Sequence, residues 1–187
     1  MPTEAYPTPL AGQRITASLL RSMQPQVARK TADTQRPAQT TLQADPHLQF
    51  DVVAGAVYIL DGWIKFDGPS AADLNLGFSA PAGVLGEWVA YAGGHSPMIT
   101  FSNTGVLQTD TQGARGYTIR TEPTDVVAAR SYGTLGVGLT PLSMDIKATL
   151  RVGPTSGTYA LVWAQFVSDA SPVTLYTDSW LRLQRIA

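Results

Sequence analysis

Side chains able to do chemistry are few in this sequence. It contains no cysteine, so thiolate nucleophiles, disulfides and cysteine-based zinc sites are excluded. Its two histidines are His47, next to Pro46, and His95, in the loop-like stretch GGHSP. Neither can be tied to a serine or an aspartate in a catalytic constellation, and no H-E-x-x-H, P-loop or G-x-S-x-G motif occurs. A loop histidine of this kind is typical of a surface or structural position.

Carboxylates offer a weak case for glycoside hydrolysis, which needs two acidic side chains held close together. Any β protein with this many acidic residues offers such pairs by chance. A glycine-rich stretch, GTLGVG at residues 133–138, is superficially similar to a nucleotide loop, yet no helix is expected after it to bind phosphate. We therefore predict no enzymatic activity, no cofactor and no metal site. The carboxylates considered are Asp61, Asp67, Asp73, Glu87 and Asp110.

A polar stretch over residues 92–116 is the candidate ligand-binding loop. It is rich in Gly, Ser, Thr and Asn, and it lacks the spacing of a calcium-binding loop. Sugar or cation binding is one interpretation, and an ordinary surface loop is the other. The side chains assigned to this possible ligand loop are His95, Asn103, Asp110 and Arg115.

All four tryptophans fall in predicted strands. Large aromatic side chains in strands usually pack in the core or in a subunit interface, and we predict that role for most of them. The alternative is that one of them lines a carbohydrate-binding face. The four are Trp63, Trp88, Trp163 and Trp180.

Charge and hydropathy exclude several classes of protein. Charged residues make up 14% of the chain, against roughly 25% in an ordinary soluble domain, so the surface is unusually neutral. A net charge of −1 argues against nucleic-acid binding, which needs a basic stripe. No signal peptide is visible, and no apolar run approaches the roughly 18 residues that a membrane span needs. We expect a soluble protein made in the cytoplasm, with no membrane insertion.

Residues 1–45 are predicted to form an anchoring arm. Three early prolines hold its start extended, and a short helix is expected over residues 15–23, with Thr16 as its N-cap and Pro25 ending it. A helix of two turns is not stable alone, so its apolar face must pack against something. The polar residues 26–46 are interpreted as a linker or an extended crossover. The apolar face, assigned to anchoring, consists of Ile15, Leu19, Leu20 and Met23.

Residues 46–187 are predicted to form an antiparallel β-sandwich, similar to a jelly roll. Apolar and polar residues alternate over short segments separated by turn signals, as is typical of this class. Asp61-Gly62 is expected to be a bulge or twist point. The predicted strands cover residues 48–52, 57–66, 74–78, 84–91, 98–101, 106–108, 117–121, 134–152, 159–167, 173–176 and 180–186.

Several stretches of the chain together carry a family resemblance. They are AGQRITASLL (residues 11–20), RKTADT (29–34), TTL (40–42), FDVVAGAVY (50–58), ADLNLGFSAPAG (72–83), GTYALVWAQ (157–165) and TDSWLRLQRIA (177–187). In these stretches the chain resembles small virion proteins of tailed phages and prophages of actinobacteria. Such proteins are minor tail, fibre-like or head-decorating components. The strand pattern and the SWLRL near the end are also similar to trimeric jelly rolls of the tumour-necrosis-factor type.

The resemblance implies a non-enzymatic virion structural protein, held on the capsid surface or the tail by its arm. It also implies other virion proteins as partners and the virion as its location, after synthesis in the host cytoplasm. A homotrimer is expected because apolar sandwich faces and a low-charge surface favour symmetric packing. The alternative is a receptor- or carbohydrate-binding module that contacts host cell-surface glycan. An enzyme degrading cell-wall polymer is a third hypothesis.

Overall fold

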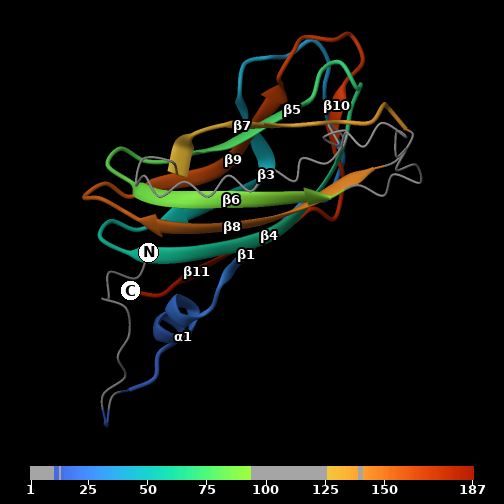
Figure 1. Cartoon of the computed structure of the whole chain (residues 1–187). Coiled ribbons are helices and arrows are strands. Elements are labelled where there is room, and N and C mark those ends of the chain that lie inside the picture. Colours follow the sequence, from blue (N-terminus) through green and yellow to red (C-terminus); the bar gives the residue numbers. More distant parts are fainter. Residues whose placement is uncertain (1–10, 13, 94–125, 139–140) are drawn as a thin grey trace, which may run out of the picture.

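Two antiparallel sheets pack face to face in the computed structural model, with one short helix outside them (Figure 1). The structure describes residues 11–12, 14–93, 126–138 and 141–187. The prediction of an all-β sandwich with a short N-terminal helix is confirmed, whereas the jelly-roll topology stays a prediction. The predicted strands over 98–101, 106–108 and 117–121 lie outside the described residues.

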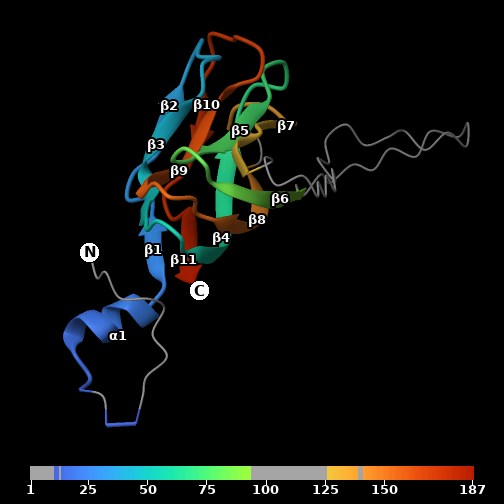
Figure 2. The same ribbon diagram turned by 90° about the vertical axis from the view of Figure 1, so that its left-hand side faces the viewer.

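Helix α1 (Ala17–Met23) is the predicted helix of the arm. Thr16 has extended backbone angles, and its side-chain oxygen accepts a hydrogen bond from the Leu19 amide at 3.1 Å, so it is the N-cap. Gln24 is extended again, immediately before Pro25. Figure 2 shows α1 standing away from the sandwich, to which strand β1 connects it.

A seven-stranded sheet is centred on the long strand β4, which pairs with β8 along one side. On its other side, β4 pairs first with β11 and then, at its end, with β10. Beyond these neighbours lie β1, β2 and β6. The seven strands are β1 (Gln26–Arg29), β2 (Thr34–Arg36), β4 (Val57–Asp67), β6 (Leu85–Gly93), β8 (Leu142–Arg151), β10 (Val173–Leu175) and β11 (Trp180–Arg185).

The second sheet has four strands in the order β3-β9-β5-β7. Its register is continuous between β5 and β9, but the pairing of β3 with β9 shifts between Ala44 and Gln49. The strands are β3 (Gln43–Val52), β5 (Leu74–Ser79), β7 (Arg130–Tyr132) and β9 (Gly157–Gln165). Strand β7 was not predicted, since three residues are too few to show alternation.

The core lies between the sheets because successive side chains of a strand point to opposite faces. Strand β8 alternates without exception, burying Leu142 and every second residue after it. Phe78 stacks on Tyr159 with ring centroids 4.8 Å apart and meets Trp88 edge-on at 5.4 Å. Each fully buried side chain of this size stabilises the fold by about 1.5–3 kcal/mol relative to an exposed one.

Of the two interpretations of residues 26–46, the linker is wrong, whereas extended backbone is present in two short strands. Strand β1 pairs with β11 and strand β2 with β10, so both belong to the seven-stranded sheet, and β3 begins at residue 43. The segment is polar because both strands are short and are paired on one side only in the sheet. Polar residues suit such edge strands.

Of the two alternatives predicted at Asp61-Gly62, a bulge or a twist point, the bulge is wrong. Both residues are paired in unbroken register with β11 and with β8. Glycine is required at position 62 for a different reason, which is close packing. A Cβ there would lie 2.6 Å from the carbonyl oxygen of Trp180 on the neighbouring strand.

Candidate functional site on the outer face of the seven-stranded sheet

The face of the seven-stranded sheet that points away from the core carries an unusual mixture of aromatic and charged side chains. On β4 the aromatic and charged side chains of this face are Asp61, Trp63 and Lys65, which alternate with buried residues and follow the apolar Ile59. Strand β11 places Trp180 directly opposite Trp63 and Arg182 directly opposite Asp61. Trp63 keeps 37% of its surface exposed, far more than an indole in the core.

Asp61 and Arg182 form a two-pronged ion pair across these strands. The Arg182 Nε lies 2.9 Å from Asp61 Oδ1, and Nη2 lies 3.1 Å from Oδ2. Both side chains are partly exposed, so the pair adds little stability, on the order of 1 kcal/mol or less. The bidentate geometry nevertheless fixes the orientation of both groups on the surface.

Two adjoining hollows lie on this face, with volumes of about 560 and 400 Å³. Asp61 and Lys147 line both of them. The outward-facing side chains of the larger hollow are Ile59, Asp61, Glu87, Val89, Lys147, Thr149 and Arg182. Those of the smaller hollow are Asp61, Tyr91, Asp145, Lys147 and Trp180. Rings and fixed hydrogen-bonding groups in shallow hollows are the chemistry of a binding surface.

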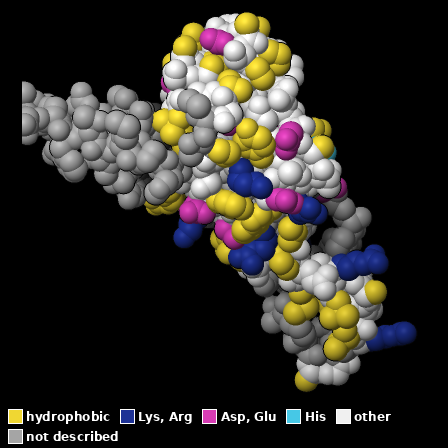
Figure 3. Space-filling view, turned by 90° about the vertical axis from the view of Figure 1, so that its right-hand side faces the viewer, with side chains coloured by type: hydrophobic (Ala, Val, Ile, Leu, Met, Phe, Trp, Pro, Cys, Tyr) yellow, Lys and Arg dark blue, Asp and Glu magenta, His cyan; other side chains and the backbone are white. Residues whose placement is uncertain are grey.

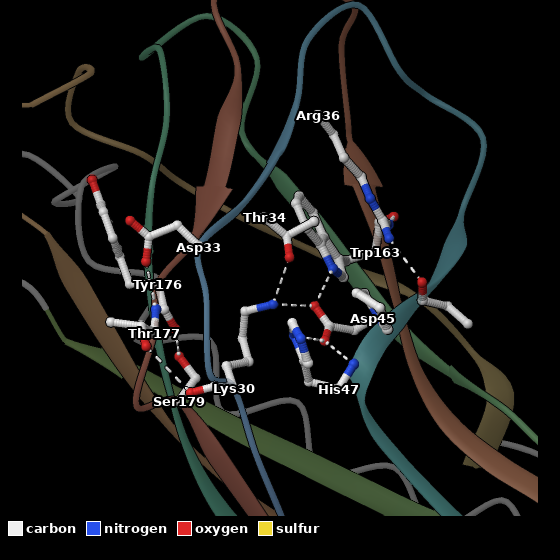
Figure 4. A network of polar contacts seen from close by, with 12 residues as sticks. Lys30, Asp33, Thr34, Arg36, Asp45, His47, Trp163, Tyr176, Thr177 and Ser179 are labelled. Atoms are coloured by element: carbon white, nitrogen blue, oxygen red, sulfur yellow. Dashed lines mark hydrogen bonds and ion pairs between the residues drawn. The ribbon is translucent and has the colours of Figure 1, made fainter.

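A second polar cluster is buried between the sheets and is shown in Figure 4. Lys30, just after β1, places its Nζ 2.7 Å from Asp45 Oδ2 and 2.8 Å from Thr34 Oγ1. Trp163 Nε1 donates to the same Asp45 oxygen at 3.1 Å, and the His47 amide donates to the other oxygen at 2.9 Å. Both ionised side chains are completely buried.

Arg36 extends this cluster toward the end of β9 (Figure 4). Its guanidinium lies 3.9 Å from the centroid of the Trp163 ring and donates to the carbonyl oxygens of Gln43, Ala44 and Trp163. Burial lowers the pKa of Arg36, and the nearby Asp45 carboxylate partly offsets that effect. Because these cations are matched to protein acceptors, we interpret the cluster as a clamp that holds β1 and β2 on the sandwich.

The structure separates the four residues predicted for the anchoring face. Leu19 is buried, with 3% exposure, whereas Ile15, Leu20 and Met23 are 68%, 51% and 47% exposed. Three of the four therefore form an outward apolar surface, and Leu19 is turned away from it. The predicted ligand-loop residues, His95, Asn103, Asp110 and Arg115, lie outside the described residues.

The other candidates from the sequence have structural partners. Asp67 accepts hydrogen bonds from the Gly138 amide at 2.5 Å and from the Tyr176 hydroxyl at 3.2 Å. The glycine-rich stretch thus folds onto a carboxylate of its own chain. Asp73 accepts from the Thr134 amide at 3.3 Å. Trp88 and Trp163 are buried in the core, which meets the prediction for two of the four tryptophans.

A search for metal ligands covers the described parts of the chain. Within them, no three His, Asp or Glu side chains lie close enough together to hold an ion. Nor does any helix in those parts have the length and apolar character that crossing a membrane requires.

Comparisons with known proteins add no relative. No family model matches the chain, no curated protein matches it, and no solved structure matches its fold. The arguments that follow therefore depend on the residues and their geometry.

Sequence reasoning considered Trp63, Trp180, Asp61 and Glu87 separately, and it missed Arg182 and Lys147. The missing signal is cross-strand pairing, which brings Arg182, Asp61 and Lys147 into one row of the sheet. Alternation within each strand predicts which side chains face outward, but it does not predict the neighbours across the sheet.

Proposed function

We propose that this chain is a non-enzymatic structural protein of a phage virion, a β-sandwich module held on the particle by its N-terminal arm. The sequence resemblance to small virion proteins motivates the proposal. The observation that carries it is the apolar surface of the arm, where Ile15, Leu20 and Met23 are all about half exposed or more. Figure 3 shows hydrophobic side chains gathered on the protruding N-terminal part, with basic side chains beside them.

The arm needs a partner for physical reasons. Helix α1 has seven residues, and an isolated helix shorter than about 12 residues is marginal in water. Burying an exposed leucine or methionine contributes roughly 1.5–3 kcal/mol. Burying Leu20 and Met23 against another virion protein would therefore stabilise both the helix and the attachment.

The partners in this proposal are other virion proteins, in the capsid or the tail, and two further copies of the chain in a homotrimer. The chain is made in the host cytoplasm and is then incorporated into the virion. Sedimentation of the purified protein tests the homotrimer, because a trimer and a monomer differ threefold in mass. A monomer at all concentrations would contradict it.

Incorporation into particles tests the anchor. Deleting residues 1–24 removes α1 but leaves β1 and Lys30 in place, so the sandwich stays folded. The double variant Leu20→Asp/Met23→Asp replaces the two residues of the apolar surface that lie on α1. We expect both to fold normally and to be lost from purified virions, measured by quantitative mass spectrometry against the major capsid protein.

Phe166→Asp is the matched control for these variants. Phe166 is exposed to a similar degree, 55%, but lies after β9 in the sandwich. Its replacement should leave incorporation unchanged. Wild-type amounts of the Leu20→Asp/Met23→Asp variant in virions would contradict the anchor. Absence of the wild-type chain from particles would contradict the virion proposal itself.

Antibody labelling of virions under the electron microscope separates the two possible positions. Label over the head fits a capsid decoration, and label on the tail fits a minor tail or fibre component.

The second candidate function, a receptor- or carbohydrate-binding module, is favoured by a different observation, the aromatic and charged outer face of the seven-stranded sheet.

A further inference from the structure

We propose that the outer face of the seven-stranded sheet, at its two adjoining hollows, binds a neutral oligosaccharide. The described residues of the site lie on β11, β4, β8 and β6. The inference goes beyond the virion proposal and does not rest on it, because none of its residues belongs to the arm.

Aromatic rings supply the first part of the argument. Trp63 and Trp180 lie opposite each other on adjacent strands, where Cβ atoms are separated by roughly 5 Å, and Tyr91 lines the same hollow as Trp180. The face of an aromatic ring is electron-rich, whereas the C–H groups on one side of a sugar ring are weakly positive. Stacking of sugar on indole is therefore favourable in both its apolar and its electrostatic contribution.

Hydrogen-bonding groups surround these rings. Sugar hydroxyls both donate and accept, so they need carboxylates as acceptors and basic side chains as donors. The bidentate Asp61–Arg182 pair presents both kinds of group, already fixed in orientation, between the two hollows. Lys147 extends the row from the far side of Asp61, and Thr149 adds a hydroxyl to the larger hollow.

The balance of charge specifies a neutral ligand. Asp61, Glu87 and Asp145 contribute three negative charges, and Lys147 and Arg182 contribute two positive charges to the lining. The lining alone therefore carries a net charge of −1. The ammonium group of Lys65 lines neither hollow, but it lies 5.5 Å from the centroid of the Trp63 ring and balances this charge. A surface with no net charge attracts neither an anionic nor a cationic polymer over its whole length. On the visible face in Figure 3, acidic and basic side chains lie near one another among hydrophobic ones.

The dimensions favour an oligomer over a single sugar. Four adjacent strands at about 4.8 Å spacing extend over roughly 14 Å, which is longer than one sugar ring. The two hollows adjoin at Asp61 and Lys147, so one chain can occupy both. Their volumes, about 560 and 400 Å³, lie within the usual range for small-molecule sites.

A second copy of the protein fits this face less well. Interface centres are depleted in charged residues, because each ion removed from water costs several kcal/mol unless it is well paired. A flat protein partner would cover Glu87, Asp145 and Lys147 together. A sugar chain leaves the rims of both hollows wet, so those charges remain hydrated.

Calorimetry on the full chain tests the site, using hexasaccharides of glucose, mannose, galactose and arabinose as probes. We expect at least one series to bind, with Trp63→Ala and Trp180→Ala each weakening the affinity tenfold or more. Arg182→Ala should weaken it as well. Phe166→Ala removes an exposed aromatic ring elsewhere and should leave the affinity unchanged. Near-UV circular dichroism and Tm verify that each variant is folded.

Three results would overturn the proposal. One is that none of the four neutral series binds the wild-type chain. Another is equal affinity of wild type and a folded Trp63→Ala/Trp180→Ala variant. The third is a change in sedimentation mass of that double variant without any glycan binding, which would make the face a subunit interface. Failure of virion incorporation affects none of these measurements.

Discussion

At the residue scale, the buried Lys30–Asp45 pair shows how polar groups are accommodated in this sandwich. Two charges out of water are costly, and they persist because every oxygen of Asp45 receives a hydrogen bond. Trp163 contributes its indole N–H and stacks under Arg36, so one side chain supports both cations. The pair fixes where the N-terminal strands meet β3.

Removing one member of the Lys30–Asp45 pair should lower the free energy of unfolding far more than removing both. Lys30→Met leaves the Asp45 carboxylate buried without its cation, and we expect it to lower the free energy of unfolding by about 3–5 kcal/mol. Urea denaturation measures this, and a cycle with Asp45→Asn isolates the coupling. Arg29→Met, next to it in sequence, breaks only the exposed pair with Asp178 and should change stability little. Equal effects of the two substitutions would contradict the clamp.

Buried tyrosines predict how stability depends on alkaline pH. Burial raises the pKa of Tyr132 from 10.0 to about 12, with a smaller opposing effect from Arg130, and burial raises the pKa of Tyr159 well above its usual range. The unfolded chain releases these protons near pH 10, whereas the folded chain retains them. The contribution of these tyrosines to the free energy of unfolding is thus present in full below about pH 10 and is lost as pH rises toward 12.

Urea denaturation between pH 9 and pH 12 measures this dependence. The raised pKa of Tyr132 alone should lower the free energy of unfolding by roughly 2–3 kcal/mol by pH 12. Tyr132→Phe should reduce the slope, since phenylalanine has no proton to lose. The exposed substitution Thr149→Ala serves as a control, and its slope should equal that of the wild-type chain. An unchanged slope for Tyr132→Phe would show that other groups control the alkaline limit.

At the scale of elements, the first 36 residues divide into two parts with different roles. Helix α1 lies outside the sandwich, whereas β1 and β2 are paired within it. Deleting residues 1–36 removes Lys30 and Arg36 along with both strands. Buried carbonyl oxygens left without Arg36 cost about 1–3 kcal/mol each, so we expect no cooperative unfolding transition.

The deletion of residues 1–24 is the control for this experiment. It should unfold within a few degrees of the full chain, because it removes none of the strands that the structure describes. Circular dichroism during heating measures both proteins. A deletion of residues 1–36 that melts like the full chain would mean that β1 and β2 do not stabilise the sandwich.

Strand prediction from this sequence succeeded where one face of a strand is buried. The apolar alternation in β4, β5 and β8 reflects a core on one side, which the sequence records directly. It failed at β1 and β2, because three or four polar residues at an edge carry no such pattern. The candidate site was foreseen only as single tryptophans, since the pairing of β11 with β4 joins residues more than a hundred positions apart.

At the scale of the whole molecule, the two ends of the chain close the same sheet. Strand β1 pairs with β11 and β2 with β10, so the first two strands find their hydrogen-bonding partners in the last two. The Ile186 amide also donates to the Val57 carbonyl oxygen at 2.8 Å. No local signal in a sequence specifies such contacts, because they depend on long-range closure.

This closure predicts one cooperative unfolding transition for the sandwich. The segment that carries β1 and Lys30 joins the two sheets. Strand β1 is paired with β11 in the seven-stranded sheet, and Lys30 is paired with Asp45 of β3 in the four-stranded sheet. Urea curves from far-UV circular dichroism and from tryptophan fluorescence should coincide, because Trp63 and Trp180 lie in one sheet and Trp163 in the other. Leu181→Ala should lower the free energy of unfolding by about 2–5 kcal/mol, because Leu181 is fully buried. Both curves should therefore move to lower urea concentration together. Two separated transitions would show that the sheets unfold independently and that the chain ends do not hold them together.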